Sequence, residues 1–148
     1  PFPLLSGERA KKVFDLIVQQ LLTPRGLRTL SPGHKDYRPT YGGDVRMRDG
    51  AYPQGTVWSY LIGPFIDAAF YVWGEDCREE AKSYIDVFFQ HLHEAGVGSV
   101  SEIFDAASPH TPRGCIAQAW GVGEVLRVAV QYHLVAGTIK PDETEALY

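Results

Sequence analysis

Cysteine is scarce in this sequence, and basic residues are outnumbered. The 148 residues contain two cysteines, Cys77 and Cys115. Two thiols are too few for a disulfide scaffold or a four-thiolate zinc site, so a reduced, cytoplasmic protein is favoured. The 18 acidic and 14 basic residues give a formal net charge of -4. An acidic balance argues against nucleic acid as a partner, since nucleic-acid binders are usually basic.

Long apolar runs and an initiating methionine are also missing. The longest apolar-rich stretch, Val57 to Trp73, is interrupted by Pro64 and Asp67. It falls short of the roughly 20 residues that a membrane span needs, so we expect no membrane contact. The single methionine lies inside the chain, at Met47, and the first residue is Pro1. We therefore expect a processed chain or part of a longer protein, forming one domain over residues 1–148.

Four segments have the apolar periodicity of helices, and none has the alternation typical of strands. The first and third segments carry one apolar stripe opposite charged residues. The second and fourth are apolar on nearly all sides, which predicts that they are buried. The four segments cover approximately residues 7–22, 54–73, 76–95 and 111–134. The sequence therefore predicts an all-α fold in which outer and inner helices alternate.

Two of the connections between these helices are long, over residues 23–53 and 96–110. Because successive helices alternate in direction, both long connections should lie at one end of the bundle. Long ordered loops usually carry function, so we expect the functional face there. The alternative is a pair of solvated loops. It fits poorly with the aromatic residues of these segments, such as Tyr37, Tyr41, Tyr52 and Phe104.

Glu102 is the candidate catalytic residue. It stands in the second long connection, between Ser101 and the apolar pair Ile103 and Phe104. A carboxylate that is partly shielded by apolar neighbours and lies near helix N-termini can act as a general base. The alternative is that Glu102 only caps or solvates a short turn after Ser101.

Two tryptophans are candidates for binding sugar rings, because indole faces stack on sugars. Trp58 and Trp120 are each predicted near the N-terminal end of an apolar helix, although tryptophan on a buried helix is commonly part of the core. Polar side chains on the same face can bind hydroxyl groups. The other predicted substrate-binding residues are Arg28, Asp49, Gln54, Thr56, His110, Arg113 and Gln118.

No metal or cofactor site is indicated by the sequence. His91 and His93 are two residues apart and point to different sides of a helix, and the cysteines lack nearby partners. Phosphate-binding and dinucleotide-binding motifs are absent from the sequence. We therefore expect neither a metal nor a cofactor.

Five stretches in a fixed order resemble the C-terminal part of the glycogen debranching enzymes, the amylo-α-1,6-glucosidase module of the prokaryotic type. Together they span about two-thirds of the chain. One departure is Pro53, where that family usually has histidine. The stretches are TPRGLRTLSP from Thr23, RDGAYPQGTVW from Arg48, LIGPFIDA from Leu61, GSVSEIFD from Gly98 and HTPRGCIAQAW from His110.

The resemblance implies a fold, a reaction and partners. The fold would be the last part of an (α/α)6 toroid. The reaction would be inverting hydrolysis of the α-1,6-linked glucose at a trimmed branch point, with Glu102 as general base. The family's general acid, an aspartate, lies before Pro1, so this chain alone should be inactive. The implied partners are a branched α-glucan or limit dextrin and the remainder of the same enzyme.

Two other functions stay open at this point. One is a non-catalytic helical module that binds oligosaccharide or forms an interface. The other is a related (α/α)6 hydrolase of α-1,4-glucans or trehalose. If the chain is part of a ring, its cut edges should expose apolar surface and promote self-association.

Overall fold

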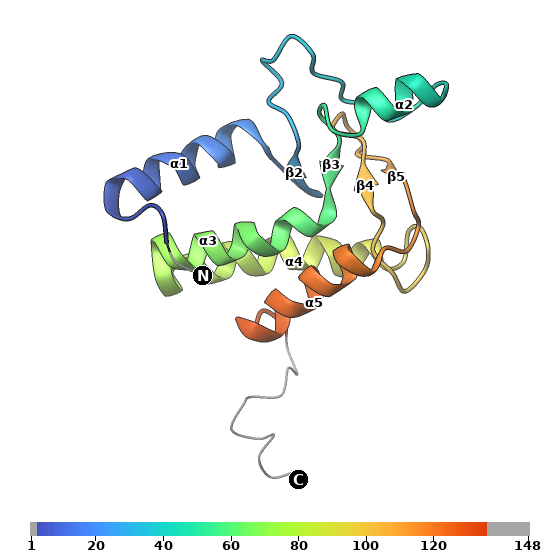
Figure 1. Ribbon diagram of the computed structural model, residues 1–148. Coiled ribbons are helices and arrows are strands. Elements are labelled where there is room, and N and C mark those ends of the chain that lie inside the picture. Colours follow the sequence, from blue (N-terminus) through green and yellow to red (C-terminus); the bar gives the residue numbers. More distant parts are fainter. Residues whose placement is uncertain (1–2, 136–148) are drawn as a thin grey trace.

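The computed structural model describes residues 3–135, in which helices and a small sheet are combined (Figure 1). The longer elements are helices α1, α3, α4 and α5, while α2 is short. Two 3-10 turns, η1 and η2, precede α3 and α4. The bounds are α1 Gly7–Gln20, α2 Val45–Ala51, η1 Ser59–Leu61, α3 Ile62–Trp73, η2 Gly74–Cys77, α4 Arg78–His91 and α5 Ala119–Gln131. Within this described part, no helix is long and apolar enough to cross a membrane.

A five-stranded antiparallel sheet lies at one end of the long helices (Figure 1). Its strands follow the chain order, and Val57 pairs with Phe104 at its centre. The strands are β1 Leu22–Thr23, β2 Gly26–Arg28, β3 Val57–Trp58, β4 Ile103–Phe104 and β5 Pro112–Arg113. The expectation of an all-α fold, the last part of an (α/α)6 toroid, is therefore wrong.

The sheet was not predicted from the sequence because its strands are two or three residues long. Alternation of apolar and polar residues cannot be recognised over so few positions. The strands are held by pairing between distant segments, and Val57, Ile103 and Phe104 are completely buried. At Gly26 an added Cβ would lie 2.8 Å from the backbone oxygen of Trp58, so glycine allows β2 to approach β3.

The helix boundaries agree with the predictions at two places and differ at two. Helices α1 and α4 lie within the predicted segments 7–22 and 76–95. The predicted segment 54–73 is helical only from η1 onward, because β3 occupies Val57–Trp58. The predicted segment 111–134 contains β5 and becomes helical at Ala119. Trp58 therefore lies on a strand, whereas Trp120 lies in the first turn of α5.

Helix α3 occupies the centre of the core and contacts α1, α4 and α5. The ring of Phe14 on α1 stacks on Phe65 of α3, with the ring centroids 5.0 Å apart. The prediction that α3 and α5 are buried on all sides is wrong. Tyr71 on α3 and Leu126 on α5 are 52% and 59% exposed. The described chain thus leaves apolar side chains of both helices without cover.

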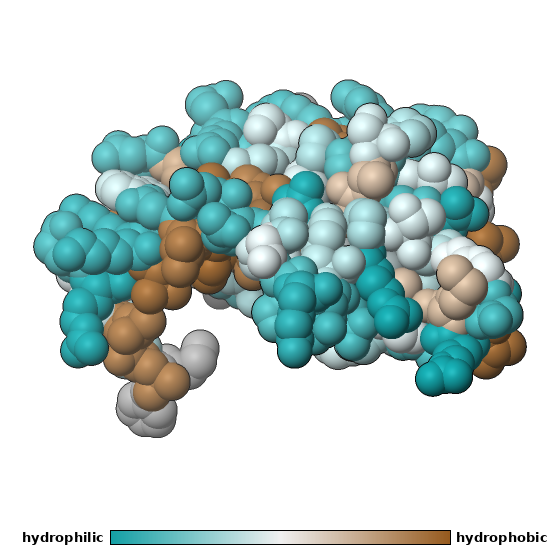
Figure 2. All heavy atoms as spheres, turned by 90° about the horizontal axis from the view of Figure 1, so that it is seen from above, coloured by the Kyte–Doolittle hydropathy of each residue, from teal (hydrophilic) through white to brown (hydrophobic). Residues whose placement is uncertain are grey.

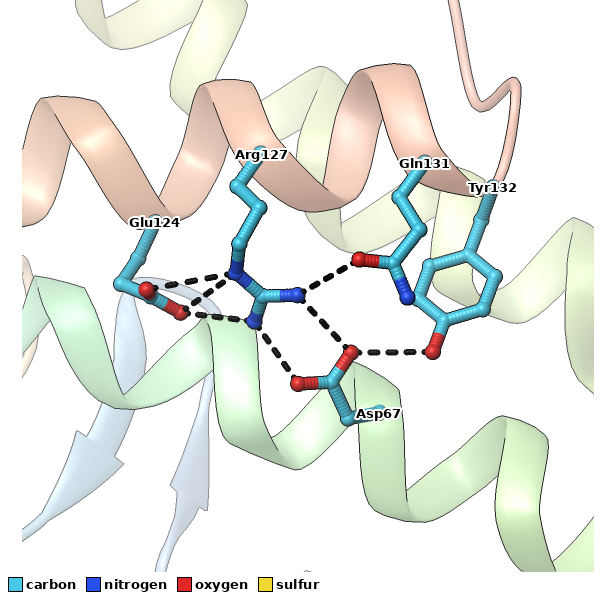
Figure 3. A network of polar contacts seen from close by, with 5 residues as sticks. All are labelled: Asp67, Glu124, Arg127, Gln131 and Tyr132. Atoms are coloured by element: carbon cyan, nitrogen blue, oxygen red, sulfur yellow. Dashed lines mark hydrogen bonds and ion pairs between the residues drawn. The ribbon is translucent and has the colours of Figure 1, made fainter. Parts of the chain in front are cut away.

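The few charges of the two apolar helices pair with each other across the α3–α5 contact (Figure 3). Arg127 donates hydrogen bonds of 3.1 and 2.7 Å to the two carboxylate oxygens of Asp67 and also contacts Glu124. Tyr132 donates to Asp67 at 2.9 Å. The side chains of Arg127 and Asp67 are more than a third exposed, and such ion pairs contribute at most about 1 kcal/mol. The network serves mainly to fix how α5 lies on α3.

The two long connections are joined to each other. They contribute β1, β2, β4 and α2, and the sheet brings their strands together. Outside the sheet, Tyr41 N–H donates to Asp105 Oδ1 at 2.7 Å, and Ala106 N–H donates to the Pro39 oxygen at 2.6 Å. This junction places Glu102, which precedes β4, beside residues that lie 50 positions earlier in the chain.

Candidate functional site

The backbone of Glu102 is fixed on both sides by neighbouring elements. Its N–H donates to the Cys115 oxygen at 2.9 Å. Its own oxygen accepts hydrogen bonds from Ser59, from the N–H at 3.3 Å and from Oγ at 3.0 Å. The residue as a whole is only 7% exposed. Glu102 is therefore a buried residue of fixed position and not the solvated or capping residue of the alternative interpretation.

Each carboxylate oxygen of Glu102 has a neutral donor. The Tyr52 hydroxyl donates to Oε1, and the Cys115 N–H donates to Oε2 at 2.9 Å. Burial acts to raise the pKa of Glu102, but the hydrogen bonds from Tyr52 and Cys115 outweigh it, so the pKa is lowered. Burial and the contact with Glu102 raise the pKa of the Tyr52 hydroxyl, which therefore stays protonated. At neutral pH, Glu102 is therefore an ionised carboxylate, and neither Tyr52 nor Cys115 carries a positive charge that would neutralise it.

Gly114 leaves the space that the Glu102 carboxylate occupies. Its φ is +67°, a conformation that L side chains rarely adopt. A Cβ added there would lie 2.5 Å from Glu102 Oε2. Both the backbone conformation and the contact with the carboxylate therefore require glycine.

Five aromatic rings form a continuous series beside Glu102, here called the aromatic series: Tyr41, Tyr52, Trp58, Tyr60 and Trp120. Successive ring centroids are 6.1, 4.5, 5.7 and 3.7 Å apart. Trp58 also donates from Nε1 to the Tyr52 backbone oxygen at 3.1 Å. Trp120 stacks one face on Tyr60, and 54% of this residue is exposed. The series thus runs from Tyr41, through Tyr52 whose hydroxyl contacts Glu102, to an indole that is open to solvent.

Two glutamine side chains carry buried oxygen atoms without a partner. Among residues 3–135, Oε1 of Gln54 and Oε1 of Gln118 accept no hydrogen bond. The Gln118 side chain also helps to lower the pKa of Glu102. An unsatisfied buried acceptor costs roughly 1–3 kcal/mol, so a ligand hydroxyl that donated to it would be favoured.

Asp105, the nearest competing carboxylate, has a different environment. It accepts a hydrogen bond from Tyr41 N–H on Oδ1 and forms an ion pair with Arg113, with Nε 3.0 Å from Oδ2. Its backbone oxygen contacts His110 Nδ1 at 3.1 Å. Because Arg113 pairs with its charge and Tyr41 N–H donates to it, Asp105 is suited to holding the two connections together.

The other predicted site residues differ in how far they are buried. Arg28 donates from Nη1 to the Leu22 oxygen at 3.1 Å. Thr56 is fully buried and donates to the Tyr52 oxygen at 2.7 Å, so it supports the loop that carries Tyr52. Asp49 is exposed on α2. The contact of these residues with substrate stays a prediction.

Tyr41, Tyr52, Tyr60 and Gly114 contribute to the site but were not predicted as site residues. Tyr52 and Glu102 are 50 residues apart, so no local pattern connects them. The sequence feature that could have indicated Tyr52 is its position within the family-like stretch from Arg48 to Trp58. The importance of Gly114 depends on a contact between side chain and backbone that only coordinates reveal.

Histidines and cysteines do not gather into a metal site in the described part of the chain. No group of three His, Cys, Asp or Glu side chains has a geometry that would hold a metal ion there. His91 is fully buried and its ring nitrogens contact Glu94 and Ser101.

Removing the Tyr52 hydroxyl should shift the titration of Glu102. Tyr52→Phe removes one of the hydrogen bonds that offset burial, so the pKa of Glu102 rises. As the pH falls, an activity that needs the carboxylate is then lost at a higher pH than in the unmodified enzyme. Because the pKa of Glu102 is lower in the folded protein than the unfolded-state pKa near 4.5, its ionised carboxylate stabilises the fold at pH values above 4.5. This contribution is lost as the pH falls through the folded-state pKa. Tyr52→Phe should therefore also reduce stability at neutral pH.

The measurements are the pH profile of kcat/KM and the free energy of unfolding at pH 7. Tyr60→Phe is the matched control, because Tyr60 belongs to the aromatic series but its hydroxyl does not contact Glu102. Equal profiles for the two variants would contradict the role of the Tyr52 hydroxyl.

Comparison with known protein families gives a match over most of the chain. The model of a family described as amylo-alpha-1,6-glucosidase matches residues 1–127. The matched region includes Tyr52, Trp58, Glu102, Gly114 and Trp120. The resemblance found in the sequence motifs is thereby confirmed.

Proposed function

The chain belongs to the amylo-alpha-1,6-glucosidase family, and from this membership we propose that it supplies the general base of a glycoside hydrolase. The substrate is the α-1,6-linked glucose at a branch point of glycogen or a limit dextrin. The reaction inverts the configuration at the anomeric carbon. Glu102 is the base, and the general acid is an aspartate in the remainder of the same enzyme.

The state of Glu102 supports this role. An inverting glycosidase needs one carboxylate that is ionised when substrate binds, so that it can take a proton from the attacking water. The hydrogen bonds from Tyr52 and Cys115 keep Glu102 ionised and hold it still. A carboxylate has about four lone-pair sites, so its two oxygens can accept from the water besides the donors Tyr52 and Cys115. The water oxygen bonds to the anomeric carbon, its proton passes to Glu102, and the leaving oxygen takes a proton from the acid.

The aromatic series supports the substrate class. The free face of Trp120 offers an apolar platform for a sugar ring, while Trp58 is packed between Tyr52 and Tyr60 and shapes the wall beside the carboxylate. The unpaired oxygens of Gln54 and Gln118 can accept hydrogen bonds from sugar hydroxyls. We keep Arg28, Asp49, Thr56, His110 and Arg113 as further members of the proposed binding face.

A single observation carries the proposal: a buried carboxylate with only neutral donors contacts Tyr52 of an aromatic series that ends at the exposed Trp120. The test is the configuration of the first product. We expect the complete enzyme to release β-glucose from the α-1,6 branch of a limit dextrin, observed by NMR before mutarotation. An α-glucose product would contradict inversion. Faster hydrolysis of maltotetraose or trehalose would contradict the proposed linkage.

We propose further that the remainder of the enzyme covers the exposed apolar surface of this chain. An open groove of about 1080 Å³ runs between α1 and α3. Figure 2 shows apolar side chains gathered at one side of the molecule, beside a hollow. The groove lining is mainly apolar and includes Leu5, Val13, Ile17, Pro64, Ala68 and Tyr71. Apolar surface of this extent is normally a contact surface.

Two results follow for the isolated chain. It should hydrolyse no limit dextrin, because the acid is absent from it. It should also self-associate, which sedimentation velocity over a range of concentrations would detect. Replacing Val13 and Tyr71 by serine should reduce the association, whereas serine at the exposed Val97, outside the groove, should not. A monomer at high concentration would contradict this part of the proposal.

A further inference from the structure

A chain of polar contacts ends at Ser101, the residue before Glu102, and the proposed reaction does not use it. It connects Arg25 of the β1–β2 turn, Glu94 and His91 at the end of α4, and Ser101 before β4. Arg25 Nη2 lies 2.7 Å from Glu94 Oε1, and Glu94 Oε2 lies 3.0 Å from His91 Nδ1. His91 Nε2 lies 3.2 Å from the Ser101 N and 3.1 Å from its Oγ.

The contact with Ser101 assigns the tautomer of His91. A backbone N–H can only donate, so Nε2 must accept and carries no proton. The ring proton is therefore on Nδ1, from which it donates to Glu94. His91 is 0% exposed and Ser101 is 1% exposed, so water cannot replace either partner. A protonated imidazole would place an N–H against the N–H of Ser101.

Glu94 and Arg25 support this tautomer. The hydrogen bonds from Arg25 and His91 lower the pKa of Glu94, which keeps its carboxylate ionised and able to accept. The guanidinium of Arg25 also lies over the ring of Phe104, 5.6 Å from its centroid, and the His91 ring contacts the same residue at 4.9 Å. Phe104 follows Glu102 by two residues. The polar chain thus contacts the backbone of Ser101, before Glu102, and the ring of Phe104, after it.

We propose that His91 is a positioning residue for Glu102, acting through the Ser101 backbone in the neutral tautomer that Glu94 and Arg25 maintain. This inference rests on the proposed function of Glu102. A general base must be held close to the attacking water, and a displacement of about 1 Å can cost about 100-fold in rate. Cys115 and Ser59 hold the backbone of Glu102 itself, and His91 holds the backbone N–H of the residue before it, Ser101.

The test compares two substitutions of His91 in the complete enzyme. His91→Met removes the acceptor while keeping a side chain of similar length. His91→Gln keeps an amide oxygen that can accept from the Ser101 N–H. We expect kcat to fall by about 10- to 100-fold in His91→Met, with KM changed by less than about threefold. His91→Gln should restore most of the lost kcat.

Glu94→Gln tests the same chain at a position whose side chain is 41% exposed. It removes the charge that favours the proton on Nδ1, and kcat should fall by about 3- to 10-fold. Glu79→Gln makes the same change at the other end of α4, where no contact leads to Glu102, and should leave kcat unaltered.

Two readouts separate positioning from a purely structural role. The acid limb of the kcat/KM profile should move to higher pH in His91→Met, because a displaced Glu102 loses its hydrogen-bond donors. Hydrogen exchange of the peptide that contains residues 99–105 should accelerate in His91→Met and not in His91→Gln.

The outcomes are distinguishable. Equal kcat for His91→Met and the unmodified enzyme, or equal losses in the Met and Gln variants, would overturn the inference. So would an unchanged acid limb in His91→Met. If Glu102→Gln itself keeps its turnover, the proposed function fails instead, and the hydrogen-exchange comparison still decides whether His91 anchors Ser101.

Discussion

Glu102→Gln should lower the turnover of a branched limit dextrin by the complete enzyme by about 10²- to 10⁴-fold, the usual effect of losing a general base. The amide keeps the shape of the side chain, and its oxygen can still accept from one of the two donors, Tyr52 or Cys115. It cannot take the proton of the attacking water. Substrate binding should stay within about threefold, because the aromatic series is intact.

Two further variants make this prediction specific. Asp105→Asn removes a carboxylate three residues away, but one that Arg113 already neutralises, so its effect on turnover should be smaller. Trp120→Ala should show the opposite pattern, with a raised KM and a nearly unchanged kcat, because it removes the exposed stacking face. Near-normal turnover in Glu102→Gln, together with a large loss of turnover in Asp105→Asn, would show that Asp105 and not Glu102 is the general base.

Gly114→Ala should reduce kcat by about 10- to 100-fold without touching any ionisable group. The new Cβ would lie 2.5 Å from Glu102 Oε2, closer than any real Cβ contact, so the carboxylate or the loop must move. Either movement breaks the hydrogen bond from Cys115 N–H to Oε2. The kinetic measurement is kcat on limit dextrin, with binding determined separately on the Glu102→Gln background.

The control for backbone strain is Gly98→Ala. Gly98 has φ of +85°, and an added Cβ there would have no neighbour within 4 Å. Both substitutions carry the strain of a left-handed residue, of order 1 kcal/mol, but only the one at position 114 meets the carboxylate. Comparable losses of kcat in the two variants would show that strain, and not the contact with Glu102, is responsible.

The sequence by itself determined the features that depend on local pattern. The apolar stripes of α1 and α4 predicted their positions, because a period of 3.6 residues repeats several times within each helix. The isolation of Glu102 between apolar neighbours marked it as unusual. The five ordered motifs identified the family, and the match over residues 1–127 confirms it.

Only the tertiary structure decided the sheet and the composition of the site. Strands of two or three residues form when partners from distant segments meet, as Val57 and Phe104 do, and a single segment carries no sign of its partner. The same pairing brings Tyr52 to Glu102 and leaves Gly114 as the residue that fits beside the carboxylate. A residue's type and neighbours in the sequence can suggest a base, but its charge state depends on donors that reach it through space.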